Sequence, residues 1–317
     1  MSLKVTGTGS ALPANIITNE DLTSFLDTND EWIRTRTGIG QRHILSDGET
    51  VSDIAEIAAR KAMAAANIAA DDIDYILCAT LGGDYITPSL ACVLQERLGA
   101  TCPAMDVNGA CSGFLYALDV AECMFIRGNV KRILLIAAEG LSRITDWTDR
   151  STCVLFGDGA GAVILEKGDD LLYIRTTAQG ASKPLHALFP TGNFPQKPRP
   201  DHSFIRMEGS EVFKFAVNAI CSEIEMALET TKLAPSQIHH VLLHQANLRI
   251  IDSARRKLGI PQENYAVNID KVGNLSAASI PVLLDACQQE GRFTRGDILL
   301  MAGFGAGLTT GTAILRW

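Results

Sequence analysis

The sequence predicts an α/β protein built from two similar halves, in which helices cover both faces of largely parallel sheets. The first observation is a set of near-continuous apolar segments of strand length, which is typical of strands buried on both faces. The second is that amphipathic helical segments alternate with these strands. The third is that segments of the first half recur in the second half at a fixed spacing.

The repeat is carried by three pairs of segments. Two pairs have an offset of 165 residues. In the first, 67–80 (NIAADDIDYILCAT) matches 232–245 (KLAPSQIHHVLLHQ), and in the second, 132–140 (RILLIAAEG) matches 297–305 (DILLMAGFG). At an offset of 150 residues, 161–167 (GAVILEK) matches 311–317 (GTAILRW). Short apolar strands match easily by chance, but two independent pairs with one offset favour a duplication.

We therefore predict an N-terminal half at 1–168 and a C-terminal half at 209–317, which carry different parts of the chemistry. Between them, 169–208 is rich in Pro, Gly and polar residues after a first strand, and we expect a connector whose loops could fold over a site. The C-terminal half opens on a helix with Gly209 and Ser210 as its cap. Its predicted apolar face is Phe213, Val217, Ile220, Ile224 and Leu228.

Composition narrows the function classes. A net charge of -8 argues against general nucleic-acid binding. The chain has no apolar run long enough to span a membrane, and we expect that its N-terminal residues are not a secretory signal. Its 8 cysteines include no CxxC pair, which favours reduced thiols in a cytoplasm. We expect a cytoplasmic protein that needs no metal ion or cofactor.

Cys111 is the first candidate for chemistry. It lies in DVNGACSGFLYALDV (106–120), where a predicted strand turns into a predicted helix. Free N–H groups and the helix dipole at such a place are expected to lower a thiol pKa toward neutrality. Gly109 and Gly113 allow a tight turn and close approach of a substrate. Local sequence alone leaves a nucleophile and a small core thiol equally open. For Cys78, Cys123, Cys153, Cys221 and Cys287, core packing is favoured.

His244 and Asn274 are candidate partners for that thiol. His244 follows a buried strand, and ligands bind at the carboxyl ends of parallel strands. Asn274 lies in a glycine-marked turn before a helix, where a structural turn residue is the common alternative. The repeat relates Cys111 to Ser276 at the 165 offset, so the two turns occupy nearly equivalent places. The three side chains are therefore expected to meet in a central crevice.

The segment GFGAGLTTG (303–311) superficially suggests a phosphate-binding loop. A dinucleotide loop must open a helix, whereas the residues that follow here predict a strand. We instead expect a turn that aims backbone N–H groups at a developing oxyanion.

Taken together, these features resemble the β-ketoacyl-acyl carrier protein synthase III family, the condensing enzymes that start bacterial fatty acid synthesis. The resemblance runs end to end and rests on DTNDEWIRTRTGIGQRH (27–43), DVNGACSGF (106–114), DWTDRST (146–152), FGDGAGA (156–162), GSEVFKFAV (209–217), HQANLRII (244–251), GNLSAAS (273–279) and GFGAGLTTG. It implies the thiolase fold, with two duplicated βαβαβαββ halves in a five-layered α-β-α-β-α structure, and a homodimer.

The resemblance also implies a reaction and its residues. Cys111 would take the acyl group of an acyl-CoA primer as a thioester, with the backbone N–H groups of Cys111 and Ala306 holding the oxyanion. His244 and Asn274 would bind malonyl-acyl carrier protein and stabilise the enolate left by loss of CO₂. That enolate attacks the acyl-cysteine to give β-ketoacyl-acyl carrier protein.

For coenzyme A, the resemblance implies two sets of residues. Thr28, Trp32, Arg36 and Arg150 would hold the nucleotide, with adenine stacked between Trp32 and Arg150. Gly209, Phe213 and Asn247 would line the pantetheine tunnel. Trp32 and Arg36 could equally be ordinary surface packing on a helix.

Further implied residues bear on the protein partner and the primer. A basic cluster, Lys214, Arg249, Arg256 and Lys257, would dock the acidic carrier protein, although a solvated helix face is the alternative. Thr87 replaces a phenylalanine that closes the acyl pocket across the dimer in some relatives, which predicts room for primers longer than acetyl. Leu275 replaces the usual threonine after the asparagine, and Ala306 stands where glycine is frequent.

Two other functions remain open. One is a condensing or acyl-transferring paralogue of secondary metabolism. The other is a partner that binds acyl chains without reacting, which the joint presence of Cys111, His244 and Asn274 argues against. Hydroxymethylglutaryl-CoA synthase and polyketide synthase types are disfavoured by HQANLRII and the short C-terminus.

Overall fold

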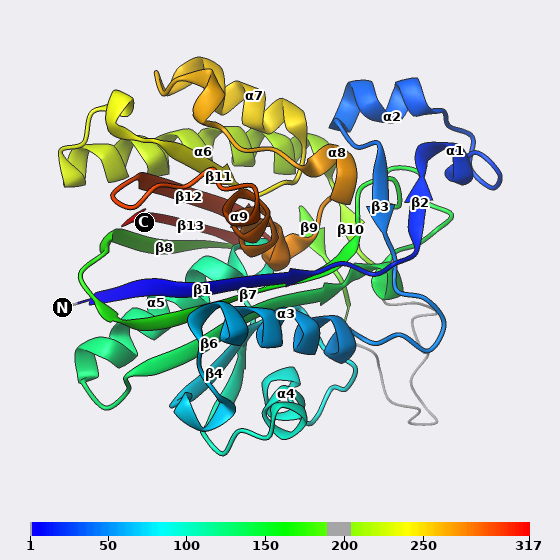
Figure 1. Ribbon diagram of the computed structural model, residues 1–317. Helices are drawn as coiled ribbons and strands as arrows, with labels where there is room; N and C mark the ends of the chain where they lie inside the picture. The colour runs from blue at the N-terminus through cyan, green and yellow to red at the C-terminus, as the bar shows by residue number, and fades with distance from the viewer. Residues whose placement is uncertain (1, 189–203) are drawn as a thin grey trace.

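A computed structural model describes residues 2–188 and 204–317. Two sheets stack within three layers of helices, as the sequence predicts, so the five-layered α-β-α-β-α arrangement is confirmed (Figure 1). The first sheet has the order β1 (Ser2–Ala11), β7 (Asp158–Gly168), β6 (Arg132–Gly140), β4 (Tyr75–Ala79) and β5 (Ala104–Val107). The second has the order β11 (His240–Leu243), β12 (Ile298–Gly305), β13 (Gly307–Arg316) and β8 (Leu171–Ala181).

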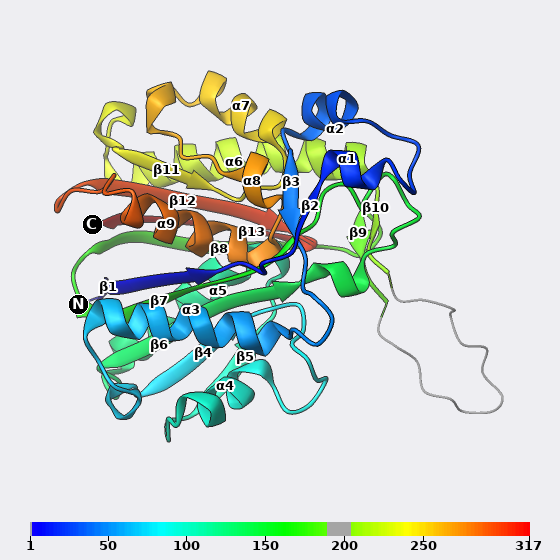
Figure 2. The same cartoon turned by 45° about the vertical axis from the view of Figure 1, so that its right-hand side comes forward.

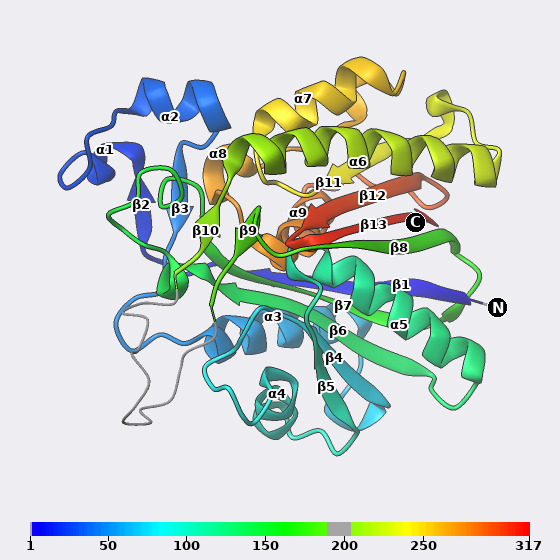
Figure 3. The same ribbon diagram turned by 180° about the vertical axis from the view of Figure 1, so that it is seen from behind.

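The helices sort into layers by the faces they bury. Helices α5 (Gly113–Arg127) and α9 (Ser279–Gln289) lie between the sheets, and both contribute to one central apolar cluster. Helices α3 (Val51–Ala66) and α4 (Leu90–Leu98) cover the outer face of the first sheet. Helices α6 (Gly209–Thr231) and α7 (Leu248–Lys257) cover the second, as the view from behind shows (Figure 3).

Shorter elements gather at one end of the sandwich. They comprise α1 (Asn19–Leu22), α2 (Asp30–Thr37), α8 (Ile269–Val272) and the strand pairs β2 (Ile16–Thr18) with β3 (Gln41–His43) and β9 (Leu185–His186) with β10 (Arg206–Met207). Figure 2 shows them clustered beside the ends of α6 and α7. This end of the molecule surrounds the site described below.

The sheets are mixed, so the prediction of largely parallel sheets is wrong. β4 runs parallel to β5 and β6, and β11 runs parallel to β12. β6–β7 and β12–β13 pair antiparallel, and only Ala306 separates β12 from β13. A connection that short permits only an antiparallel pair. The strands are still apolar throughout, because helices cover both faces.

The segment expected to connect the halves contributes a strand. β8 begins two residues after 169 and pairs with β13, in the place that β1 takes beside β7 in the first sheet. Residues 189–203 of that segment lie outside the described residues.

Helix α6 buries a face rotated from the predicted one. Ile220, Ile224 and Leu228 are buried as expected, but the first turns bury Val212 and Ala216 instead of Phe213 and Val217. Phe213 is half-buried because it lines a cavity. The residue before the helix is Glu208, which makes no side-chain cap bond, so Gly209 and Ser210 are the first helical residues and not the cap.

Candidate active site

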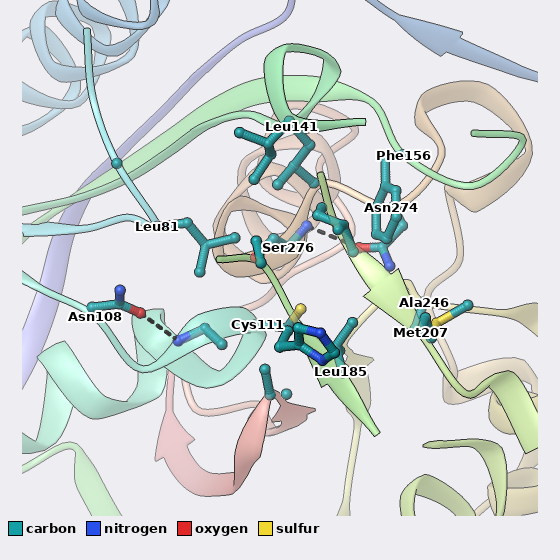
Figure 4. A pocket seen from close by; sticks show the side chains of 18 of the residues that line it. Leu81, Asn108, Cys111, Leu141, Phe156, Leu185, Met207, Ala246, Asn274 and Ser276 are labelled. Atoms are coloured by element: carbon teal, nitrogen blue, oxygen red, sulfur yellow. Dashed lines mark hydrogen bonds between the residues drawn. The ribbon is translucent and has the colours of Figure 1, made fainter. Parts of the chain in front are cut away.

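The three sequence-predicted residues Cys111, His244 and Asn274 line one cavity of about 680 Å³. It opens where β4, β6, β11 and β12 end, so side chains from both halves meet there, as expected. Figure 4 shows Cys111, Asn274 and Ser276 around the same space, with Leu81, Leu141 and Phe156 forming apolar walls.

Cys111 lies in a 3₁₀ turn, Ala110–Ser112, between β5 and α5. Asn108 shapes the turn because its Oδ1 accepts a hydrogen bond from Ala110 N–H at 3.2 Å. Ala110 then takes a left-handed φ of 47°, which lifts the next residue toward the cavity. The sequence thus places the thiol just before a helix, as predicted.

The expected lowering of the thiol pKa is wrong. Burial raises the pKa of Cys111 to about 12, and the negative charge of nearby Glu139 adds to the rise. The nearby Ser276 hydroxyl acts in the opposite direction and lowers the thiol pKa. Desolvation therefore outweighs the helix terminus, and the thiol needs a proton acceptor to react.

The Asn274 turn repeats this geometry in the second half. Ser276 has a φ of 48°, and its N–H donates to Asn274 Oδ1 at 2.9 Å. The backbone of Asn274 is held by Leu155 O at 2.9 Å and Gly157 N at 3.0 Å. With Oδ1 engaged, the amide can offer Nδ2 as a donor to the cavity.

The structural offset between these turns is 166 residues, since Ala110 matches Ser276 and Asn108 matches Asn274. The 165 offset that related Cys111 to Ser276 is therefore wrong by one residue, and Cys111 corresponds to Ala277. The 165 offset does hold for β4 and β11, so Ala79 corresponds to His244. It is wrong by one residue for 132–140 and 297–305, because the strand pairings match Glu139 to Gly305, an offset of 166.

His244 is 1% exposed and follows β11 directly. Neither of its ring nitrogens has a hydrogen-bond partner among the described residues. Its ring packs edge-on against Phe304 at 5.3 Å between centroids. Burial lowers its pKa to about 3, so the imidazole is neutral and can donate a hydrogen bond to a ligand but is a poor base.

The turn between β12 and β13 packs on the nucleophile. A Cβ at Gly305 would lie 2.6 Å from Cys111 N, so this position has no room for a side chain. Thr309 stabilises the turn, because its hydroxyl donates to Ala306 O at 3.0 Å, with Gly109 O at 3.2 Å as the alternative acceptor. These contacts hold Ala306 in the wall of the cavity that contains Cys111.

The first half carries a carboxylate at the equivalent place. Glu139 pairs with Gly159 across β6–β7, as Gly305 pairs with Thr309 across β12–β13. Glu139 Oε1 accepts a hydrogen bond from Ala277 N–H at 3.4 Å. Ala277 corresponds to Cys111, and Glu139 corresponds to Gly305. In the first half a carboxylate oxygen therefore lies beside the N–H of Ala277, whereas in the second half no side chain lies beside the N–H of Cys111.

The residues assigned to the pantetheine tunnel line the cavity. Gly209, Phe213 and Asn247 are all part of its wall. Asn247 caps α7 and donates from Nδ2 to Arg36 O at 3.0 Å, which joins α7 to α2. The residues assigned to the pantetheine tunnel are therefore connected to those assigned to the nucleotide through the bond between Asn247 and Arg36.

The nucleotide set lies just outside that wall. The Trp32 ring has the guanidinium of Arg36 at 4.6 Å and that of Arg150 at 4.9 Å from its centroid. Arg150 also donates to Asp27 O at 2.5 Å. Thr28 is half-buried, and its hydroxyl has no partner among the described residues. The structure brings Trp32, Arg36 and Arg150 together, with both guanidinium groups over the ring expected to hold adenine.

The four basic residues of the expected docking surface are exposed: Lys214, Arg249, Arg256 and Lys257. Arg249 lies 5.3 Å over the Phe213 ring, next to the cavity. Arg256 and Lys257 end α7, about 10 Å further along the helix axis. Lys214 faces a separate groove of about 600 Å³. Thr87 is exposed and is not part of the cavity wall of its own chain, although Tyr85 and Ile86 are.

Sequence reasoning missed Glu139, Thr309 and Phe304. Glu139 had a visible signal, because a carboxylate within the apolar strand RILLIAAEG must find buried partners. Thr309 and Phe304 had none, since threonine and phenylalanine are ordinary strand residues. Of the cysteines expected in the core, Cys123 is instead exposed, on the outer side of α5.

Within residues 2–188 and 204–317, no group of three or more His, Cys, Asp or Glu side chains could hold a metal ion. None of the helices described is long and apolar enough to cross a membrane. All eight cysteines are free.

Comparison with known proteins matches two family models described as 3-oxoacyl-[acyl-carrier-protein (ACP)] synthase III: its C-terminal model at 228–317 and its main model at 105–181. A protein of Thiobacillus denitrificans named β-ketoacyl-[acyl-carrier-protein] synthase III is 47% identical, over 99% of both chains. One of the same name from Xanthomonas campestris is 46% identical, over 99% of this chain and 98% of the relative.

Solved structures agree. 3-Oxoacyl-[acyl-carrier-protein] synthase III from Aquifex aeolicus superposes with a TM-score of 0.93 at 44% identity, covering 99% of this chain and all of that one. The priming β-ketosynthase of the R1128 polyketide pathway gives 0.92 at 32% identity, covering 99% of this chain and 96% of that one.

Proposed function

Because the chain belongs to the β-ketoacyl-acyl carrier protein synthase III family, we propose that its 680 Å³ cavity condenses an acyl-CoA primer with malonyl-acyl carrier protein. The observation that carries the proposal is the convergence of Cys111, His244 and Asn274 on that cavity from separate elements. The enzyme is an acyltransferase, and its product is a β-ketoacyl-acyl carrier protein.

In the first half-reaction, Cys111 attacks the thioester carbonyl of acyl-CoA. The backbone N–H groups of Cys111 and Ala306 stabilise the oxyanion, which the absence of a side chain at Gly305 makes possible. Coenzyme A lies along Gly209, Phe213 and Asn247, and its adenine stacks on Trp32. The acyl group remains on the sulfur as a thioester.

In the second half-reaction, malonyl-acyl carrier protein enters the same tunnel. Neutral His244 and the Nδ2 of Asn274 donate hydrogen bonds to its thioester oxygen. Loss of CO₂ leaves an enolate whose charge these two donors stabilise. The enolate carbon attacks the acyl-cysteine carbonyl, the new carbon–carbon bond forms, and Cys111 leaves as the thiolate.

The wider setting follows the family. The partners are acyl-CoA and the carrier protein, with no nucleic acid and no membrane, in the cytoplasm. A homodimer is supported by β5, which lies at the sheet edge, and by Tyr85 and Ile86, which are 60% and 73% exposed beside the cavity. The reaction uses no metal or cofactor beyond its substrates.

The small residue at Thr87 favours primers longer or more branched than acetyl. Thr87 does not line the cavity of its own chain, so the proposal places its effect in the pocket of a second subunit. A panel of acyl-CoA primers with malonyl-acyl carrier protein measures this, and a strong preference for acetyl-CoA over C4–C6 primers rejects it.

A second candidate is priming in a specialised pathway, favoured by the likeness to the R1128 priming β-ketosynthase. Its chemistry would be the same, and only the acceptor would differ. Comparing carrier proteins of fatty acid and polyketide synthesis as acceptors separates the two.

Mass spectrometry after mixing with acyl-CoA tests the proposal. We expect one acyl adduct on Cys111, lost in Cys111→Ala and kept in Cys123→Ala, which removes an exposed thiol on α5. No adduct on the unmodified protein would favour a non-catalytic acyl-binding partner.

A further inference from the structure

Gln245 is a fully buried amide next to His244 that the mechanism above does not use. Among the described residues, His244 and Ala246 line the cavity and Gln245 does not. Its side chain is therefore out of reach of a substrate in the cavity and of a protein on the surface. A polar side chain with no exposure must be satisfied inside the protein, so its hydrogen bonds indicate its role.

The Gln245 amide bonds to backbone groups of two separate segments. Its Nε2 donates to Leu243 O, at the end of β11, at 2.8 Å. Its Oε1 accepts a hydrogen bond from Asn268 N–H at 3.2 Å. A carbonyl can only accept and a backbone N–H can only donate, so these partners fix the orientation of the amide. The amide thus joins the end of β11 to residue 268.

This bridge stands where a direct backbone bond would otherwise form. β11 pairs in parallel with the segment before α8, and there Ala266 N–H donates to Val241 O at 3.0 Å. In a parallel ladder the next such bond falls two residues later on both segments, between Asn268 N–H and Leu243 O. The Gln245 amide lies between these two groups and bonds to both. It therefore holds the two segments apart by the length of one amide group.

Each of the two segments carries one of the donors assigned to the enolate. His244 comes directly after β11, and its N–H donates to Ala302 O at 2.8 Å. Its ring has no hydrogen-bond partner among the described residues, so the backbone and packing set its direction. On the other side, Asn268 O accepts a hydrogen bond from Lys271 N–H at 3.0 Å and begins α8, which leads to Asn274.

We propose that Gln245 is a positioning residue that sets the spacing between His244 and Asn274, so that it acts on condensation and not on acyl loading. This inference rests on the proposed function. The two side chains must converge on one thioester oxygen, and donors are effective at about 2.7–3.1 Å from it. A displacement of about 1 Å can cost about 10²-fold in rate. Cys111 is carried by a different turn, so loading does not depend on this spacing.

The test measures the second half-reaction on protein that has already been loaded. Acyl-CoA loads Cys111, malonyl-acyl carrier protein is added, and mass spectrometry follows the conversion of the adduct into β-ketoacyl product. The rate constant of this conversion does not depend on how much of the protein is folded. Gln245→Met keeps the length of the side chain but makes neither hydrogen bond. We expect it to load at the original rate and to convert about 10- to 10²-fold more slowly.

Gln237→Met is the matched control. Gln237 Oε1 also accepts a backbone hydrogen bond, from Ala234 N–H at 2.8 Å. Its side chain is exposed, and it precedes β11, at the opposite end of the strand from His244. Both half-reactions should be unchanged in this variant. If Gln245→Met does not fold, Gln245→Asn takes its place, because its amide is one CH₂ too short to reach both partners.

A double variant separates positioning from a general structural role. In Asn274→Ala only one of the two donors remains, so adding the Gln245 change should slow conversion by less than about threefold more. Conversion at the original rate in the Gln245 variant, equal losses of loading and conversion, or losses that multiply in full in the double variant overturn the proposal. If the unmodified protein takes up no acyl group, or does not convert it, the proposed function itself fails.

Discussion

Asn108 and Asn274 occupy equivalent positions in the two halves, and each accepts a hydrogen bond at Oδ1 from the N–H two residues later, at 3.2 and 2.9 Å. The same side-chain turn forces Ala110 and Ser276 into left-handed conformations. One turn thereby presents the Cys111 thiol, and the other presents the amide of Asn274. The two halves thus share the geometry of the turn, and the different residues at equivalent positions give each turn its own chemical role.

Gly305→Ala should abolish acyl loading, because the backbone of the nucleophile turn must shift to admit the new side chain. The added Cβ would lie 2.6 Å from Cys111 N and displace the N–H that stabilises the oxyanion. Losing one such donor costs about 10²–10³-fold in rate. Adduct formation followed by mass spectrometry measures this, with Gly180→Ala as control, because a Cβ there meets nothing within 4 Å. Equal adduct formation in both variants would contradict the assigned oxyanion site.

His244→Ala and Asn274→Ala should separate the half-reactions. Both residues are assigned to the enolate, so each variant should still form the acyl adduct on Cys111. Condensation with malonyl-acyl carrier protein should fall about 10²–10³-fold. Measuring adduct and β-ketoacyl product in the same sample tests this. A variant that loses the adduct as well would place its residue in the first half-reaction.

Trp32→Ala should weaken coenzyme A binding without touching the chemistry. Stacking worth about 1 kcal/mol predicts roughly a fivefold rise in KM for acyl-CoA at unchanged kcat. The matched substrate is the acyl-pantetheine thioester, which has no adenine and should show no change. Adenine between Trp32 and Arg150 needs about 7 Å between the two planes. Arg150 now lies 4.9 Å from the ring centroid, so its guanidinium must move outward on binding.

Docking of the carrier protein should depend on charge. Arg249→Glu should raise KM for malonyl-acyl carrier protein and reduce the salt dependence of kcat/KM, because an acidic partner is steered by exposed basic residues. Lys131→Glu is the control, since Lys131 is exposed just before β6, at the opposite end of the sheet. Docking that does not weaken between low and high ionic strength would remove the argument for this surface.

The buried His244 should make the fold sensitive to acid. Its pKa is about 3 in the folded chain and about 6.5 when unfolded, so the unfolded state binds a proton first as the pH falls below 6.5. The contribution of His244 to the free energy of unfolding is therefore fully present above pH 6.5 and is lost as the pH falls toward 3. At pH 5 the loss is about 2 kcal/mol. Urea unfolding at pH 7.5 and 5 should show a smaller acid loss for His244→Phe than for the unmodified protein. An identical loss in both would mean that His244 is protonated in the folded state.

The fold could be predicted from the sequence because apolar strands and repeated segments are local signals. Cys111, His244 and Asn274 could be predicted for the same reason, since each follows a recognisable strand or turn. The one-residue shift that relates Cys111 to Ala277 was not, because apolar strands match equally well at neighbouring registers. The raised pKa of the Cys111 thiol could not be predicted from the sequence either, because it depends on burial and on Glu139, which lies on a separate strand. Pairing between strands and desolvation are long-range properties that no local pattern contains.

The equivalence of Glu139 and Gly305 offers a starting point for inhibitor design. The Glu139 carboxylate shows how an oxygen anion sits against the N–H of a strand-to-helix turn in this fold. Glu139 corresponds to Gly305 and Ala277 to Cys111, so the matching place for an oxygen in the second half lies beside Cys111 N, where Gly305 carries no side chain. A small carboxylate or hydroxamate placed beside Cys111 N would imitate the charged intermediate of the reaction and is a starting point for an inhibitor.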